Sequence, residues 1–220
     1  MDNKPKTSRD YLNPLLDETE GFSETPYQDQ RGFTTVGHGF NLDAEDTANL
    51  MRLKGIDVDG IRANTSRISK EQADDVRNSI LDKKEEMLRN KINPDMYDML
   101  PENKKAALMS LMYNSPGLIG PNLTQSVAGD DDINAAREIM LNSNKKKDPG
   151  ILHRRIKEAQ MYSGDNFQNV VKTLTPEEKK QMLDIINKTQ NENTKLEILN
   201  TYGRQLGLTP EPIAFNKFKK

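Results

Sequence analysis

Two carboxylates and one hydroxyl near the amino terminus have the residue types of a hydrolytic site. Glu20 directly precedes a glycine at the predicted end of a helix, and Asp29 opens a predicted turn with Thr35 on the strand beyond it. The negative end of a helix dipole disfavours another negative charge, so we expect a raised pKa at Glu20, as a general acid requires near neutral pH. Asp29 and Thr35, on the two sides of a hairpin bend, could together hold and polarise one water.

Spacing alone does not distinguish this pair from ordinary surface carboxylates, because the chain carries 34 acidic residues and solvated acids are the usual case. The glycines that follow add context. Gly37 and Gly39 flank His38, and residues without a side chain allow a ligand to approach the backbone closely. We therefore take the stretch 16–42 as the candidate site, with Gly37 and Gly39 as candidate substrate-binding positions.

Short elements are expected to position these residues. Residues 9–20 read as a helix, with Pro14 near its first turn, where a missing N–H is harmless, and with Gly21 ending it. The turn 29–32 begins with aspartate and ends with glycine, which is typical of a turn between two strands. The predicted strands span 26–28, 33–36 and 38–42.

The rest of the chain reads as mostly helical. Ser69, with Gln72 three residues later, forms a capping box that opens a helix to about residue 91. Its apolar stripe is thin, which favours a helix that bridges two lobes over one buried in a core. The run 104–114 is apolar on most faces and indicates the central helix of a second lobe, whereas 55–68 should be irregular. Further helices are predicted over 44–54, 122–128, 132–142, 149–162, 176–188 and 195–204.

Composition excludes several classes of function. The net charge is −2, from 32 basic and 34 acidic residues, so nothing favours nucleic acid as a partner. The absence of cysteine excludes disulfides and thiolate metal sites, and two histidines leave little material for another kind of metal site. The acidic runs at 57–60 and 130–132 lack the ligand spacing of a calcium loop and read as turns or helix starts. We expect no cofactor, no metal and no membrane span, since no apolar run approaches roughly 20 residues.

The motif around the candidate site resembles a known family. Glu20, Asp29 and Thr35, set in EGF and YQDQRGFTTVGHG, resemble the catalytic signature of the T-even-phage-type lysozymes, the muramidases of glycoside hydrolase family 24. That signature reads YxDxxGxxTxGxG after the glutamate. The likeness extends over about 9–165, through the long helix and the apolar helix to the run beginning PGILHRR at residue 149.

The resemblance implies an α+β, mostly helical, two-lobed lysozyme-like fold with a small antiparallel sheet in its N-terminal lobe. Residues 1–165 would form the catalytic domain, and 166–220 a helical extension. Within the catalytic domain, the resemblance implies an N-terminal lobe, an inter-lobe helix and a C-terminal lobe over about 9–68, 69–92 and 93–165.

Roles for individual residues also follow from the resemblance. Glu20 would protonate the glycosidic oxygen, Asp29 would lie on the opposite face of the sugar, and Thr35 would place the water, with inversion as the outcome. Arg154 matches the arginine that pairs with the catalytic glutamate. Asn114 stands where the family has a polar cleft residue, although a helix C-cap is an equal explanation.

One departure from the family pattern concerns a histidine. The family commonly has histidine after Gly-x-Gly, whereas this chain has Phe40 there and His38 at the x position. Because successive side chains of a strand point to opposite faces, we expect His38 to face away and to be a surface or hairpin-packing residue. Weaker support by Phe40 would lower the activity or displace its pH optimum.

The implied function is hydrolysis of the β-1,4 bond between N-acetylmuramic acid and N-acetylglucosamine in bacterial peptidoglycan. A lytic transglycosylase is an alternative, against which the Asp29–Thr35 pair speaks, and a non-catalytic virion protein that retains the fold is another. Residues 164–220 have too little apolar content for a core of their own, so they either pack on the main body or bind a partner. A phage virion or tail protein is the candidate partner of 166–220. The start of the chain lacks the apolar segment of a signal peptide, so we expect the protein in the virion, or in the host cytoplasm before delivery to the periplasm.

Overall fold

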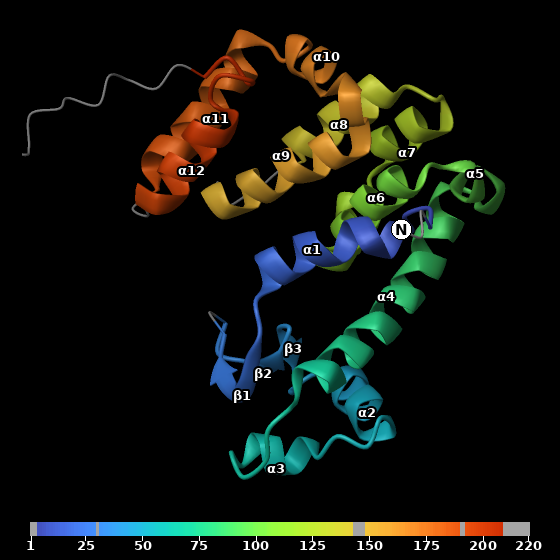
Figure 1. Cartoon of the computed structure of the whole chain (residues 1–220), viewed down its shortest axis with the longest axis vertical. Coiled ribbons are helices and arrows are strands. Elements are labelled where there is room, and N and C mark those ends of the chain that lie inside the picture. Colours follow the sequence, from blue (N-terminus) through green and yellow to red (C-terminus); the bar gives the residue numbers. More distant parts are fainter. Residues whose placement is uncertain (1–3, 30, 143–147, 190–191, 209–220) are drawn as a thin grey trace, which may run out of the picture. The chain divides into compact units, whose positions relative to one another are not determined.

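The structure is a computed structural model that describes residues 4–29, 31–142, 148–189 and 192–208. The chain divides into two compact units, Met1–Gly117 and Leu118–Lys220, which we call the N-terminal unit and the C-terminal unit. The architecture is α+β and mostly helical, with one small antiparallel sheet in the N-terminal unit, and so confirms the predicted fold class (Figure 1).

Helix α1 (Ser8–Glu20) carries the first candidate residue at its last position. A capping box at Thr7 and Asp10 begins the helix, and Gly21, with a φ of 67°, ends it as predicted. The apolar face of α1, with Leu12 fully buried, packs on helix α6 (Glu102–Asn114), in which every residue from 106 to 112 is buried. The prediction for Pro14 was wrong, since it lies inside α1 and not in its first turn.

The sheet follows α1 directly and has the order β1 (Ser23–Gln28), β2 (Thr34–Gly37) and β3 (Phe40–Asn41). Both pairings are antiparallel, with Tyr27 opposite Thr35 and Val36 opposite Phe40. A third strand beginning at residue 38 was wrong, because His38 lies in the turn between β2 and β3. The positive φ values of its two glycine neighbours, 63° at Gly37 and 85° at Gly39, interrupt the strand there.

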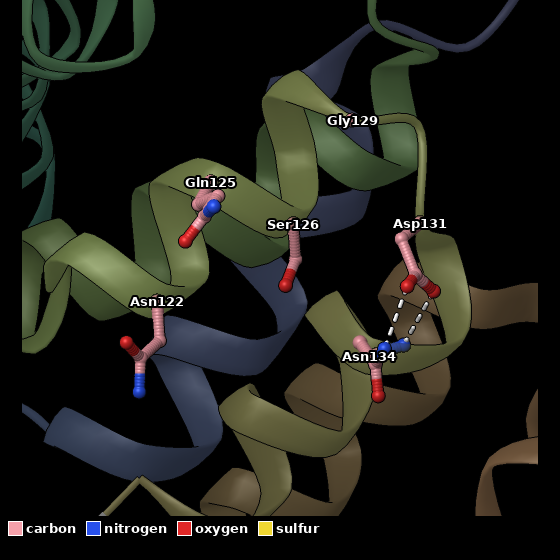
Figure 2. Close-up of a pocket in the computed structure, with 6 residues that line it drawn as sticks. All are labelled: Asn122, Gln125, Ser126, Gly129, Asp131 and Asn134. Carbon is pink, nitrogen blue, oxygen red and sulfur yellow. Dashed lines mark hydrogen bonds between the residues drawn. The ribbon is translucent and has the colours of Figure 1, made fainter.

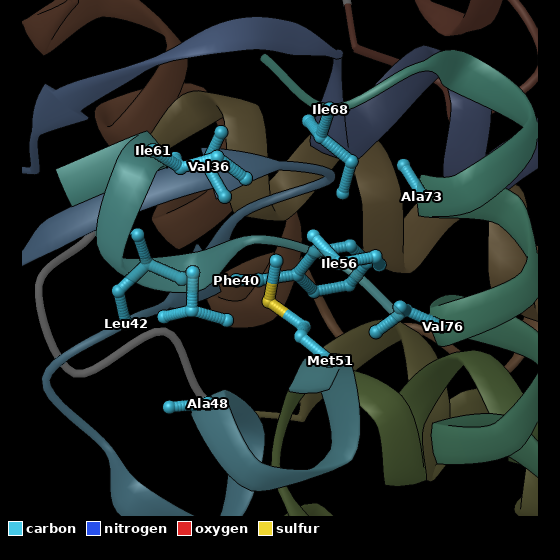
Figure 3. Close-up of a cluster of buried hydrophobic side chains, with 11 residues drawn as sticks. Val36, Phe40, Leu42, Ala48, Met51, Ile56, Ile61, Ile68, Ala73 and Val76 are labelled. Carbon is cyan, nitrogen blue, oxygen red and sulfur yellow. The ribbon is translucent and has the colours of Figure 1, made fainter. Parts of the chain in front are cut away.

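An apolar cluster beneath the sheet forms a core of the N-terminal unit (Figure 3). It includes Val36 and Phe40 from the sheet, and side chains from helices α2 (Glu45–Leu53) and α3 (Val58–Arg62). Helix α3 lies where irregular structure was expected. Asp57 caps it by accepting hydrogen bonds from Gly60 N at 2.9 Å and Ser66 Oγ at 2.7 Å, which is the helix-start reading of that acidic run.

Helix α4 (Lys70–Ile92) begins with the predicted capping box at Ser69 and ends before helix α5 (Pro94–Met99). In Figure 1, α4 runs from the sheet, α2 and α3 at one end to α5 and α6 at the other. Two side chains tie α1 to it. Arg9, in the first turn of α1, contacts Asp82 at 2.9 Å and Glu85 at 3.0 Å. Arg77 of α4 contacts Asp17 near the other end of α1 at 2.6 Å. The lobe boundaries near residues 68 and 92 stay predictions.

The C-terminal unit is helical in its described residues. Helix α8 (Asp132–Leu141) packs on α7 (Pro121–Ala128) and on α9 (Pro149–Ser163), and α10 (Phe167–Lys172) packs on α8 and α9. The last helices, α11 (Pro176–Lys188) and α12 (Glu192–Tyr202), both pack on α9. Of the two alternatives for the tail, packing on the main body is therefore the one observed. Its buried apolar residues include Met182, Ile186, Ile198 and Tyr202.

Among the described residues, every helix is too short or too polar to cross a membrane.

Candidate active site

Glu20 ends α1 and is partly exposed. Glu20 lies four residues after the buried Leu16, so its side chain projects from the edge of the apolar face of α1. Gly21 then takes a conformation, φ 67° and ψ −166°, in which an L side chain would be strained. The chain turns at this glycine from the helix into β1.

Asp29 directs its carboxylate into its own turn. Oδ1 accepts hydrogen bonds from the backbone N–H groups of Arg31 at 2.8 Å and Phe33 at 2.9 Å, and Oδ2 lies 3.6 Å from Arg31 Nε. The hydrogen bonds from Phe33 and Arg31 and the arginine charge hold the pKa of Asp29 below its usual range. A carboxylate with a depressed pKa stays ionised, so Asp29 suits the acceptor of a proton better than its donor.

Thr35 joins Asp29 through the backbone of Phe33. Its side chain is buried, and Oγ1 donates to the carbonyl oxygen of Phe33 at 3.1 Å. The same carbonyl accepts from Asp29 N at 3.0 Å. With its proton committed to this carbonyl, the Thr35 hydroxyl keeps its acceptor capacity for a further group.

Tyr27 is a site residue that the sequence analysis did not single out. It lies opposite Thr35 in the sheet and is 42% exposed. Burial, followed by the negative charges of Asp29 and Glu20, raises the pKa of its phenol. Both carboxylates therefore lie within electrostatic reach of one ring. Tyr27 precedes Asp29 by two residues in the motif, but Asp29 lies beyond the end of β1, so alternation along a strand does not put the two side chains on one face.

Phe40 belongs to the core and not to a polar network. It is 3% exposed, and a Cβ atom added at Gly37 would meet its ring carbons at 2.9 Å. Gly37 is thus needed for the packing of this ring. Gly39 is exposed, with open space where a side chain would project. The predicted contact of these glycines with substrate stays a prediction.

His38 is not a surface residue, so that part of the expectation was wrong. It is 2% exposed and packs between the rings of Phe22 and Phe40, with centroid distances of 5.4 and 6.1 Å. Its Nδ1 lies 2.8 Å from the carbonyl oxygen of Gly21, and its Nε2 lies 2.7 Å from Asp74 Oδ1. The strand-alternation argument failed because His38 is in a turn.

The remaining predicted residues belong to helices α6 and α9. Asn114 is the exposed last residue of α6 in the N-terminal unit. Arg154 lies on α9 in the C-terminal unit, is 5% exposed, and donates from Nε to Glu158 Oε1 at 3.1 Å. Arg155 also contacts the fully buried Glu158. The roles of Arg154 beside Glu20 and of Asn114 in the cleft stay predictions.

Asp17, His38 and Asp74 offer ligand atoms within 4.8 Å of one another, as a metal site would. Arg77, 3% exposed, donates to both carboxylates, at 2.6 Å to Asp17 and 3.0 Å to Asp74. Lys70 adds a second cation at 3.0 Å from Asp74. Since these side chains already supply the positive charge, we assign no metal to this cluster.

A polar groove of about 440 Å³ lies between α7 and α8 in the C-terminal unit (Figure 2). Asp131 accepts hydrogen bonds there from Asn134 N at 3.1 Å and Nδ2 at 2.6 Å, which caps α8. Among the described residues, the lining includes none of the predicted site residues. It consists of Asn122, Gln125, Ser126, Gly129, Asp131 and Asn134.

A comparison with models of known protein families agrees with the lysozyme-like fold. A family model described as phage lysozyme matches residues 17–158, more than half of the chain, and the match includes Glu20, Asp29 and Thr35. Comparison with curated proteins gives no match. The chain therefore belongs to the phage lysozyme family, whose general activity is the lysozyme-type hydrolysis of peptidoglycan.

Proposed function

We propose that this protein is a muramidase that hydrolyses the β-1,4 bond between N-acetylmuramic acid and N-acetylglucosamine. The observation that carries the proposal is the linkage of Asp29 and Thr35 through the backbone of Phe33. It joins an ionised carboxylate on the turn to a hydroxyl acceptor on the adjoining strand β2. If the turn had only a structural role, the carboxylate of Asp29 would be needed to hold it but the buried hydroxyl of Thr35 would not.

The proposed reaction is a single displacement with inversion. Glu20 gives its proton to the glycosidic oxygen, and the C1–O bond to the leaving sugar breaks. A water attacks C1 from the opposite face, and Asp29 takes the proton that the water loses. The product is a hemiacetal at muramic acid. Asp29 then releases its proton to solvent and Glu20 takes one up from solvent, which restores the enzyme.

The hydrogen bonds of Asp29 fit the role of base. Its Oδ1 is held by two backbone N–H groups, while among the described residues Oδ2 has only the longer contact to Arg31 Nε at 3.6 Å. Oδ2 can therefore accept from a water. Thr35 can accept from the same water through a lone pair of Oγ1, and two acceptors define its orientation.

Other residues complete the proposed site. Asn114 and Gly39 contact substrate, and Tyr27 is the aromatic residue next to the carboxylates, whose charges raise the pKa of its phenol. The role of Arg154 beside Glu20 stays a prediction from the family resemblance.

The release of reducing ends from purified peptidoglycan tests the proposal. Glu20→Gln should lower the rate by about 10²–10⁴-fold, the usual contribution of general acid catalysis. Glu45→Gln is the matched control, because Glu45 is a carboxylate in the same unit whose side chain is 72% exposed. Its rate should equal that of the wild type. Equal rates for the wild type and a folded Glu20→Gln protein would contradict the proposal.

The alternative of a lytic transglycosylase predicts a different product. Reaction in oxygen-18-labelled water separates the two, because hydrolysis adds one labelled oxygen to C1 of muramic acid whereas an anhydro product gains none. We expect the labelled hemiacetal. A product without label would replace the muramidase by the transglycosylase. Docking on a phage virion through 166–220 stays a prediction.

A further inference from the structure

The last turn of α1, which presents Glu20, is held to α4 at two points. The first is the ion pair between Asp17, three residues before Glu20, and the buried Arg77, at 2.6 Å. The second begins one residue after Glu20, where the carbonyl oxygen of Gly21 meets Nδ1 of His38 at 2.8 Å. The backbone of Glu20 therefore lies between two anchored positions.

The two anchoring side chains, Arg77 and His38, contact the same carboxylate. Asp74 of α4 lies 2.7 Å from His38 Nε2 and 3.0 Å from Arg77 Nη2. Burial opposes the ionisation of Asp74, but hydrogen bonds from Lys70 and His38 and the charge of Arg77 outweigh it and keep its pKa below the usual value. Asp74 is thus a carboxylate that accepts from both anchors at once.

Both nitrogens of the His38 ring take part in these contacts. A carbonyl oxygen only accepts, so Nδ1 must donate to Gly21, and an ionised Asp74 requires Nε2 to donate as well. One ring nitrogen thus contacts the backbone at the end of α1 and the other contacts α4. Phe22 and Phe40 pack on the ring and fix its plane.

We infer that His38 is a positioning residue for Glu20, which it holds in place by linking Gly21 to Asp74. The inference rests on the proposed role of Glu20 as the acid. Phe40 fills the core at the position where the family commonly has histidine, and the turn at Gly37 and Gly39 brings a different histidine to the end of α1. A displacement of the acid by about 1 Å can lower a rate by about 10²-fold, so a link one residue away bears directly on catalysis.

The chain offers a matched control at the other end of the same helix. Arg9 also ties α1 to α4, through Asp82 and Glu85, but in the first turn of α1. Arg9→Gln therefore loosens the same pair of helices far from Glu20 along α1. If His38 acts only on stability, the two sites should affect kcat alike at equal loss of stability.

The test is kcat and KM on a defined peptidoglycan fragment, together with thermal unfolding, for the following proteins. His38→Ala should lower kcat by about 10- to 100-fold with little change in KM, while Arg9→Gln should leave kcat unchanged. Asp74→Asn should retain more activity than His38→Ala, because the amide can donate to Nε2 of a neutral ring that still donates to Gly21. Asp17→Asn, which alters a half-exposed residue and so spares the fold, should lower kcat less than His38→Ala.

Each outcome either supports or overturns the inference about His38. Unchanged kcat in His38→Ala, or in Asp17→Asn if His38→Ala does not fold, overturns the inference while loss of activity in Glu20→Gln leaves the proposed function standing. An equal fall of kcat in Arg9→Gln and the His38 variant also overturns it. Full activity in Glu20→Gln overturns the proposed function and the inference together.

Discussion

The two turns of the small sheet are built in opposite ways. In the turn between β1 and β2, Asp29 is bonded by residues two and four positions later, and the turn is exposed. In the turn between β2 and β3, His38 is buried and is bonded by residues 17 and 36 positions away. The first turn is held by hydrogen bonds between its own residues, and its carboxylate can accept a further hydrogen bond. The second turn is held by contacts with distant parts of the chain, so it forms only when the N-terminal unit is folded. The comparison supports the proposal that the exposed turn acts on the substrate, whereas the contacts of the buried turn join parts of the N-terminal unit to one another.

The largest effect is expected from a substitution that removes the proposed base from the first turn but keeps the structure of the turn. Asp29→Asn retains an oxygen for the N–H groups of Arg31 and Phe33 but removes the base, so kcat should fall by about 10²–10⁴-fold. Steady-state rates on a defined peptidoglycan fragment measure it. A loss below about tenfold would assign the base to another group.

The second prediction separates the water-placing hydroxyl from the strand that carries it. Thr35→Val should lower kcat by about 10- to 100-fold, because the water loses one of its two acceptors. Thr34→Val on the same strand is the control, since the hydroxyl of Thr34 accepts a hydrogen bond from the Gln28 side chain, Nε2, at 3.2 Å and is not proposed to hold the water. Similar rates in the two variants would show that the hydroxyl of Thr35 serves the sheet alone.

The third prediction concerns the buried turn and its stability. Phe40→His restores the residue that the family commonly has, but it puts a polar ring into the apolar cluster of the N-terminal unit. We expect a loss of about 2–3 kcal/mol in the free energy of unfolding, measured with denaturant. Phe40→Leu, which stays apolar, should cost less. A more stable Phe40→His protein would mean that the turn can rearrange to use a histidine at position 40.

The smallest expected effect is the pH dependence that Asp29 gives to stability. Its pKa is lowered in the folded protein, so its contribution is full above the unfolded value of about 3.9 and is lost as the pH falls through the lower folded value. Unfolding by denaturant between neutral pH and acid should therefore show a smaller loss of stability in Asp29→Ala than in the wild type. Equal acid dependence in both proteins would contradict the hydrogen-bonded turn.

The sequence predicts well the parts of the structure that, like the turn between β1 and β2, depend on local hydrogen bonds. The capping box at Ser69, the glycine that ends α1 and the apolar helix α6 depend on residues within a few positions of one another, and all are confirmed. The hairpin with its aspartate and glycine is equally local, since Gly32 N donates to Asp29 O at 2.9 Å. Local signals are sufficient where the hydrogen bonds are local.

The failures depend on contacts distant in the sequence or on short elements. His38 was misplaced because its partners lie on other elements, and alternation along a strand does not apply in a turn. Helices α3, α5 and α10 were missed, since five or six residues are too few for a period of 3.6 to emerge. Tyr27 escaped notice because its significance depends on its closeness to Glu20, which only the folded sheet creates.

The packing of α11 and α12 on α9 has a consequence for any shortened form of this protein. The ring of Tyr202 lies 5.6 Å from that of His153, the residue before Arg154, and both are buried. A cut at residue 165 would uncover this apolar surface and leave the chain prone to aggregation. Loss of activity after such a cut would thus report solubility as readily as docking. Changes to exposed residues of the tail, such as Leu196 at 39% exposure, separate the two.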